Sequence, residues 1–111
     1  MITLLSHYPY CSAGGGTGGD FTTPWVSLPE GFTDYILWVN VHNHNSGTCD
    51  LQLEEGVDAM GSEDVSTAVA LSAAGLSHYS RTISGTMARV NLSAAGAAIM
   101  TISIYLVPKQ S

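Results

Sequence analysis

Apolar and polar residues alternate along most of the chain from residue 25 onward, and a period of two is the mark of half-buried β-strands. In the run from Tyr35 to His42 the odd positions are all apolar, whereas the even positions carry Ile36, Trp38, Asn40 and His42. Successive side chains of a strand point to opposite faces of its sheet. We therefore expect the odd positions to face a core and the even positions to face away from it.

The same period predicts further strands. Cys49, Leu51 and Leu53 alternate with polar residues, and residues 100–106 alternate in the same way near the C-terminus. Weaker alternation covers residues 25–28, 67–71, 76–83 and 87–92. The predicted core consists of Leu37, Val39, Val41, Leu51, Leu53, Val90, Leu92, Ile102, Ile104 and Leu106.

Turn residues separate these runs, for example in Pro29-Glu30-Gly31 and Asn45-Ser46-Gly47. Roughly seven or eight short strands at such spacing, without a helical period, are typical of an antiparallel β-sandwich or jelly roll. The predicted fold class is therefore all-β.

Residues 1–24 differ from the rest and predict a flexible N-terminal arm ahead of a sandwich domain at 25–111. The first ten residues are rich in apolar side chains and include a possible short strand, but a glycine-rich run follows at 13–19. Glycine loses more backbone entropy on ordering than any other residue. Gly14, Gly16 and Gly19 spell the dinucleotide-binding pattern, but no strand-to-helix context surrounds them, so we do not expect nucleotide binding.

Composition and charge narrow the possible partners. The 111 residues carry three basic and nine acidic side chains, a formal charge of −6, and only 11% are charged. Without a basic stripe, neither nucleic acid nor an anionic membrane is an expected partner. So small a charged fraction suggests that much of the surface faces other protein.

The two cysteines, Cys11 and Cys49, are expected to be free thiols. The first residues lack the features of a secretory leader, so synthesis and assembly in a reducing cytoplasm is the simplest expectation. A Cys11–Cys49 disulfide is the alternative.

The segment 41–50 concentrates reactive groups, because His42, His44, Cys49 and Asp50 fall within it. Strand alternation would place both histidines on one outer face, with Asp50 returning on a neighbouring strand and Cys49 pointing inward. A zinc site needs more ligands than this, held by further hydrogen bonds, so we interpret the segment as a hydrated hairpin end. The sequence contains no convincing catalytic set, and we expect no metal, no cofactor and no enzymatic activity.

Large apolar side chains outside the predicted core are the candidates for partner binding. Aromatic residues with a polar edge are common anchors of interfaces, although the same residues could instead be covered within the molecule. The candidate partner-binding residues are Leu4, Leu5, Tyr8, Tyr10, Phe21, Trp25, Ile36 and Trp38.

Several segments together resemble the small jelly-roll virion proteins of tailed phages. They are residues 28–35, beginning Leu-Pro-Glu-Gly-Phe, the stretches 46–48 and 51–56, Ala74-Gly75, and the strands at 87–92 and 102–106. In size and layout the chain is similar to the capsid decoration proteins called cement or staple proteins, in particular those of epsilon-fifteen-like short-tailed phages. The resemblance implies a structural protein on the capsid exterior, assembled in the host cytoplasm. It also implies binding to neighbouring major capsid subunits, as a homo-oligomer such as a dimer or trimer.

A carbohydrate-binding or tail-adhesin module is the alternative function. Jelly rolls also bind glycans on aromatic platforms, and Trp25, Tyr35 and Trp38 are the candidates for one.

Overall fold

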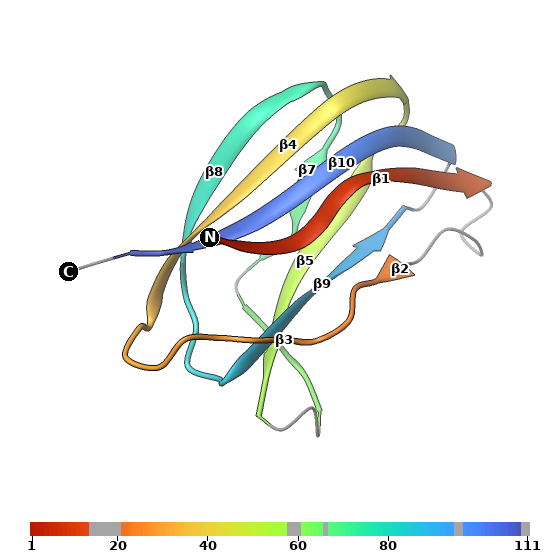
Figure 1. The fold of residues 1–111 in the computed structure, drawn as a ribbon. Helices are drawn as coiled ribbons and strands as arrows, with labels where there is room; N and C mark the ends of the chain where they lie inside the picture. The colour runs from red at the N-terminus through yellow and green to blue at the C-terminus, as the bar shows by residue number, and fades with distance from the viewer. Residues whose placement is uncertain (14–20, 58–60, 66, 95–96, 110–111) are drawn as a thin grey trace.

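Two antiparallel β-sheets pack face to face in the computed structural model, which describes residues 1–13, 21–57, 61–65, 67–94 and 97–109 (Figure 1). Sheet A has the strand order β1-β10-β4-β8, and sheet B has the order β2-β9-β5-β6, with β3 also paired to β9 and β7 to β5. The strands are β1 (Ile2–Ala13), β2 (Phe21–Thr22), β3 (Val26–Ser27), β4 (Asp34–Ser46), β5 (Cys49–Gly56), β6 (Glu63–Asp64), β7 (Val69–Leu71), β8 (Gly75–Thr82), β9 (Met87–Ser93) and β10 (Ala97–Pro108).

The strand order is that of a jelly roll. β2 and β3 both pair with β9, so together they form one interrupted strand. β6 and β7 both pair with β5 and form a second one. The first strand then pairs with the last, the second with the second-last, and so on inward, as in a long hairpin rolled into two sheets. The prediction of an antiparallel β-sandwich of jelly-roll type is confirmed.

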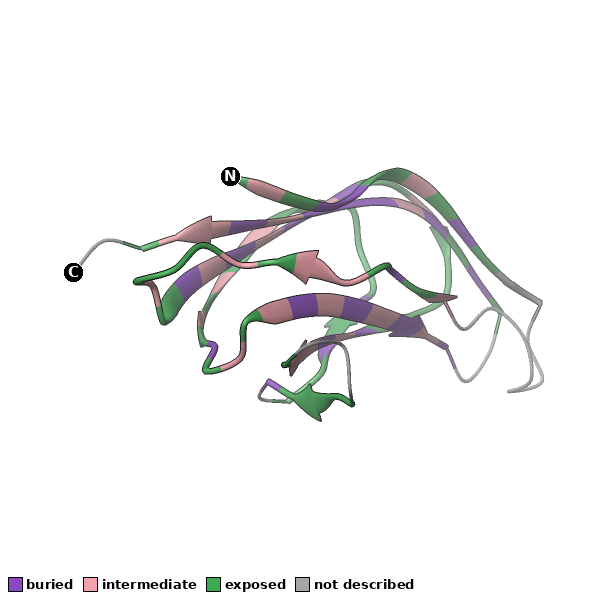
Figure 2. Ribbon diagram, turned by 60° about the horizontal axis from the view of Figure 1, so that its bottom comes forward, coloured by how far each residue is buried: buried purple, intermediate pink, exposed green. Residues whose placement is uncertain are grey.

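The core lies between the sheets and has the predicted composition. All ten residues predicted for it are buried, and none is more than 4% exposed. The alternation that predicted them is visible along the strands as bands of buried and less buried residues (Figure 2). Burying this many Leu, Ile and Val side chains contributes about 1.5–3 kcal/mol each to the stability of the fold.

The N-terminal segment differs from the predicted flexible arm. Residues 2–13 form β1, which lies along β10 at the edge of sheet A, and Leu4, Leu5 and Tyr10 are buried in the core. The apolar side chains therefore fill the sandwich itself, and hydrogen bonds to β10 offset the entropy lost on ordering the strand. The glycine-rich residues 14–20 lie outside the described residues.

At the open edge between β1 and β2, Tyr8 stacks on Phe21 with ring centroids 4.2 Å apart. At the other end of the sandwich, a carboxylate oxygen of Glu55 accepts hydrogen bonds from the amides of Ser84 and Gly85, which hold the turn between β8 and β9. These contacts tie the two sheets together at opposite ends.

Within the described residues there is no helix long and apolar enough to span a membrane.

Candidate interaction surface

Three aromatic rings form a row across the outer face of sheet A. Trp38 on β4 lies directly opposite Tyr105 on β10 and directly opposite His78 on β8. Residues opposite one another in a sheet point to the same side, and Trp38 and His78 are in contact, with ring centroids 4.7 Å apart and planes tilted by 37°. We call Tyr105, Trp38 and His78 the aromatic row.

Uncharged side chains extend the surface on both sides of the aromatic row. One flank carries Ile36, which lies opposite Val107 and Ser80. The other flank carries Asn40, which lies opposite Ser103 and Leu76.

Leu76, on the edge strand β8, leaves 64% of its surface exposed. It lies near the aromatic row, in which Trp38 and Tyr105 are half-buried and His78 is exposed, and such a combination favours contact with another apolar or hydrogen-bonding surface.

Charge is almost absent from this face. The strands of sheet A contain only two charged residues, Asp34 at the start of β4 and Arg81 near the end of β8. Arg81 shares a register position with the buried Tyr35, so it faces the inner side, and its guanidinium lies over the ring of Tyr79. Asp34 lies at the margin of the outer face, at the first position of β4, where its carboxylate accepts a hydrogen bond from the hydroxyl of Thr82.

The acidic side chains of the strands gather on sheet B instead. Asp50, Glu54 and Glu55 lie on β5, and Glu63 and Asp64 lie on β6. The two faces of the sandwich therefore differ in character. Sheet B is acidic and disfavours anionic partners, whereas the outer face of sheet A presents rings, amides and hydroxyls without net charge.

A buried hydroxyl beneath the outer face of sheet A joins three strands. Ser103 on β10 is completely buried, and its Oγ accepts a hydrogen bond of 2.8 Å from the backbone amide of His7 on β1. Nε2 of His42 on β4 lies 2.7 Å from the same Oγ, and Nδ1 of His42 lies 3.2 Å from the side-chain nitrogen of Asn40. The rings of His7 and His42 stack, with centroids 4.1 Å apart.

Ser103, His42 and Asn40 are connected in the order of a serine-hydrolase triad, but Asn40 stands in the place of the carboxylate and its NH₂ group faces Nδ1 of His42, so the geometry suits a structural role. A nucleophilic hydroxyl needs an open approach for the substrate carbonyl and donors for the developing oxyanion. Ser103 is enclosed, and its Oγ is already engaged by the amide of His7. The cluster ties β1 to β10 and β4.

The prediction that His42 and His44 share an outer face is wrong. Val41 lies opposite Ile102 and Asn43 lies opposite Thr101, so one extra residue at His42 bulges out of β4. Beyond a bulge the alternation of side chains reverses.

His44 consequently lies opposite the buried Met100 and reaches back to the carbonyl of Gly47 through its Nε2, at 2.7 Å. Asp50 is on β5, in the other sheet, so the three side chains do not converge. Among the described residues, no group of three or more His, Cys, Asp or Glu side chains is placed to hold a metal ion.

The two cysteines are not bridged, so the disulfide alternative is wrong. Cys11 is exposed on β1, whereas Cys49 is buried at the start of β5, as its place in the alternation predicted. Burial raises the pKa of the Cys49 thiol to about 11, partly offset by a hydrogen bond with the Tyr10 side chain. Burial likewise raises the pKa of Tyr35, whose hydroxyl has no hydrogen-bond partner among the described residues.

The predicted partner-binding residues separate into three groups. Leu4, Leu5 and Tyr10 are buried in the core, so in this structure they are not available to a partner. Tyr8 and Phe21 stack on each other at the sandwich edge. The remaining three lie on outer faces, and they are Trp25, Ile36 and Trp38.

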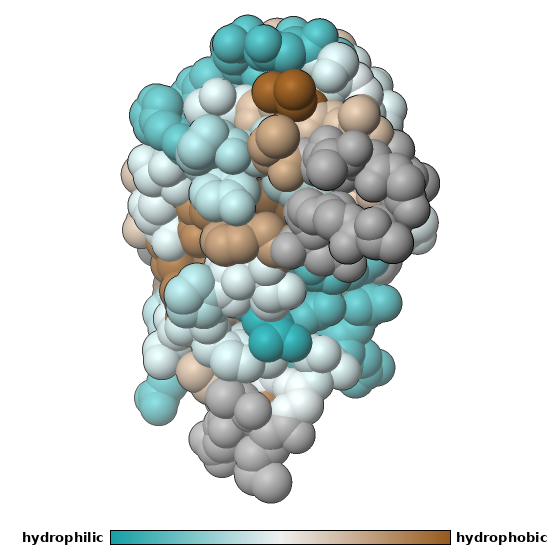
Figure 3. Space-filling model, turned by 90° about the vertical axis from the view of Figure 1, so that its right-hand side faces the viewer, coloured by the Kyte–Doolittle hydropathy of each residue, from teal (hydrophilic) through white to brown (hydrophobic). Residues whose placement is uncertain are grey.

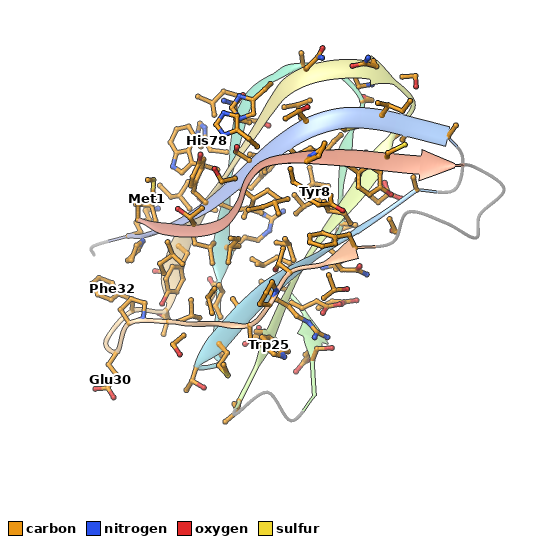
Figure 4. The ribbon with its side chains drawn as sticks, turned by 45° about the vertical axis from the view of Figure 1, so that its right-hand side comes forward. Met1, Tyr8, Trp25, Glu30, Phe32 and His78 are labelled. Atoms are coloured by element: carbon orange, nitrogen blue, oxygen red, sulfur yellow. The ribbon has the colours of Figure 1, made fainter. Side chains whose placement is uncertain are left out.

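Trp25 lies on the side of the sandwich opposite His78 (Figure 4). The guanidinium of Arg89 sits 4.3 Å from the centroid of its ring, and Arg89 Nε donates to a carboxylate oxygen of Glu54 at 2.8 Å. The ring also lies against Gly56, where a Cβ would meet it at 2.9 Å. Trp25 is therefore packed into sheet B, separate from the aromatic row.

An open cleft of about 690 Å³ lies at the end of the sandwich, between the β3–β4 loop and the turn before β9. Leu28, Phe32 and Met87 line it, and Glu30 stands at the tip of the loop (Figure 4). At the opposite end, hydrophobic residues form separate patches among hydrophilic ones (Figure 3). Among the residues that the structure describes, the outer face of sheet A is the broader uncharged surface with aligned aromatic rings.

Comparisons with known proteins add little to this picture. Neither protein-family models nor curated proteins give a match. One solved structure that is similar, described as "CBM4 structure and function", has a TM-score of 0.46 and 12% sequence identity, over 91% of this chain and 78% of that chain. The jelly-roll assignment rests on the strand order of the protein itself.

Proposed function

We propose that the protein is a non-enzymatic virion structural protein, which decorates the outside of a tailed-phage capsid by binding neighbouring major capsid subunits. The observation that carries the proposal is the aromatic row on an uncharged face of an otherwise acidic domain. Interfaces between proteins concentrate Trp and Tyr at their centre and are depleted of charge there. The resemblance to cement and staple proteins supplies the virion context.

The outer face of sheet A suits a broad contact better than a small-molecule site. Ile36 and Trp38 on β4 lie beside Val107 and Tyr105 on β10, and β8, which carries the exposed Leu76, pairs with the other side of β4. Pockets for small molecules are enclosed and carry a few convergent polar groups. A face of this kind fits a partner surface of similar breadth, as a capsid subunit would supply.

Glycan binding is the second candidate, and the aromatic row supports it too, because rings on an outer face can stack on sugars. Of the three rings predicted to form a glycan-binding platform, fewer than three are available in the structure. Tyr35 is 1% exposed and cannot serve, while one face of the Trp25 ring is covered by Arg89. Only Trp38 of the three belongs to the uncharged face.

A binding experiment separates the two functions. The purified protein is sedimented with expanded shells of an epsilon-fifteen-like phage that lack their decoration protein, and separately titrated with the surface polysaccharide of the host. We expect saturable retention on the shells at a fixed ratio to the capsid subunit, and no saturable binding of polysaccharide. Binding of polysaccharide without retention on shells would replace the decoration function with the glycan-binding one.

A further inference from the structure

Three of the four histidines of the chain lie on the outer face of sheet A. His78 on β8 ends the aromatic row, where it contacts Trp38. His7 on β1 and His42 on β4 lie side by side over the buried Ser103. All three imidazoles are exposed. They come from three different strands, so the pairing of the sheet gathers them on one face.

The hydrogen bonds of His42 are those of a neutral imidazole. Its Nδ1 lies 3.2 Å from the side-chain nitrogen of Asn40, and an amide NH₂ group can only donate, so Nδ1 accepts. The proton of the ring is then on Nε2, which lies 2.7 Å from Oγ of Ser103. A second proton on the ring would set an N–H group against the NH₂ group. Protonation of His42 therefore requires the amide of Asn40 to turn over.

The stack of His7 on His42 also suits uncharged rings. The two planes lie within 9° of parallel, and the centroids are 4.1 Å apart. Neutral rings pack well in this arrangement, whereas two imidazolium cations at this separation repel each other. Protonation therefore changes the packing of this part of the face as well as its charge.

Among the described residues, no carboxylate is bonded to any of the three imidazoles. Nδ1 of His7 lies 3.3 Å from the hydroxyl of Ser6, and the neighbour of the His78 ring is Trp38. The other ionisable groups on this side of sheet A are the phenol of Tyr105, the thiol of Cys11, the terminal amino group of Met1 and the marginal carboxylate of Asp34. Positive charge gained by the histidines is therefore not neutralised within the face.

Histidine ordinarily exchanges its proton between about pH 5 and 8. Above this range the three rings are neutral, and below it each carries a positive charge. Moving an imidazolium from water into an interface costs free energy unless the partner supplies an opposite charge. The neutral form therefore binds an uncharged partner surface more tightly. Binding is fully present above the titration range of the three histidines, and it weakens as the pH falls through that range.

We propose that the outer face of sheet A is a pH-dependent docking surface, which holds its partner while His7, His42 and His78 are neutral and releases it when they are protonated. The inference rests on the proposed function, because it names the regulation of the same site. It also specifies the partner. The contacted surface lacks carboxylates, since an acidic surface would bind the protonated face more tightly.

Cosedimentation with shells that lack their decoration protein, at about pH 7.5 and about pH 5.5, measures the effect. We expect at least a tenfold lower affinity at the lower pH. His44→Gln is the matched control, because His44 reaches back to the carbonyl of Gly47 at the β4–β5 turn, and it should keep the tenfold ratio. The triple variant His7→Asn, His42→Gln and His78→Gln should reduce the ratio to less than twofold. Asparagine is used at residue 7 because it tolerates the positive φ there.

Two results would overturn the proposal. One is a triple variant that keeps the full pH dependence, because the proton would then bind elsewhere. The other is tighter binding at the lower pH, which would identify an acidic partner surface. Circular dichroism checks the folding of the triple variant. If it does not fold, His78→Gln alone decides the question, and it should reduce the ratio at least twofold.

Retention on an uncharged phenyl matrix separates this inference from the decoration function, because it probes the face without a shell. Between the same two pH values, the unmodified protein should shift to earlier elution at the lower pH relative to the triple variant, or to His78→Gln. Such a shift without binding to shells at either pH would remove the decoration function and keep the pH-dependent surface. Equal shifts for the protein and its variant would overturn the surface itself.

Discussion

The imidazole rings of His7 and His42 lie flat against each other, with centroids 4.1 Å apart and planes within 9° of parallel. The contact joins the edge strand β1 to the central strand β4 across β10, and it requires an unusual backbone at His7, whose φ is +48°. In this left-handed conformation the His7 amide reaches the buried Ser103. The strand that seemed a flexible arm in the sequence is thus fastened at its middle.

The backbone at His7 gives the first prediction. His7→Val should lower the free energy of unfolding by about 1–2 kcal/mol more than His7→Asn, because asparagine tolerates a positive φ and a β-branched residue does not. Both variants lose the stack on His42, so the difference between their free energies of unfolding reports the cost of the positive φ at residue 7. Urea denaturation measures it, and equal stabilities would show that the turn at His7 relaxes at no cost.

Removing the N-terminal strand tests whether it belongs to the core. Deleting residues 1–13 should unfold the protein or lower its stability by several kcal/mol, since each large apolar side chain lost contributes about 1.5–3 kcal/mol. Deleting Met1 alone, which is 81% exposed, should have no effect. Thermal unfolding followed by circular dichroism is the measurement. An unchanged melting temperature for the long deletion would restore the interpretation as a separate arm.

The buried hydroxyl of Tyr35 has no partner among the described residues, so its burial costs free energy without a compensating bond. Tyr35→Phe should leave stability unchanged or raise it by up to about 1 kcal/mol. Tyr10→Phe is the matched control, because its side chain bonds with Cys49, and it should lower stability by about 1 kcal/mol. Chemical denaturation of the pair distinguishes the two hydroxyls, and a clear loss for Tyr35→Phe would reveal an unrecognised partner.

Cys49 predicts a dependence of stability on alkaline pH. Burial raises its pKa in the folded protein from 9.0 to about 11, so between these values the unfolded chain loses the thiol proton and the folded chain keeps it. The contribution of the Cys49 thiol to the free energy of unfolding is fully present below pH 9. It decreases as the pH rises toward 11, by about 2–3 kcal/mol in total. Cys49→Ala should remove that part of the slope. Identical pH profiles for the two proteins would show that the thiol is not shielded.

Much of the fold could be predicted from the sequence, because each core strand carries a strict period of two. Leu37, Val39 and Val41 on β4 show the principle, since one buried face requires one run of apolar residues. The position of β1 could not be read in the same way. Its pairing partner is β10, at the far end of the chain, and the glycines after it indicate mobility when only local propensity is considered.

The candidate surface could be predicted only in part. Ile36 and Trp38 were recognised because they interrupt a polar face, and Tyr105 carries the same signal among Thr101 and Ser103. His78 could not be recognised, since its place beside Trp38 depends on the register between β4 and β8. A single bulged residue at His42 likewise reversed the orientation of His44, and alternation alone cannot locate a bulge.

The most direct test of the aromatic row as the partner-binding site is the retention of variants on capsid shells. Trp38→Ala combined with Tyr105→Ala removes two rings from the uncharged face, while Thr22→Ala combined with Gln52→Ala changes polar side chains on sheet B. Circular dichroism first confirms that both double variants are folded. Cosedimentation with shells that lack their decoration protein should then show at least a tenfold loss of affinity for the ring variant, about 1.4 kcal/mol, and less than a twofold change for the control. A ring variant that binds as tightly as the unmodified protein would contradict the account.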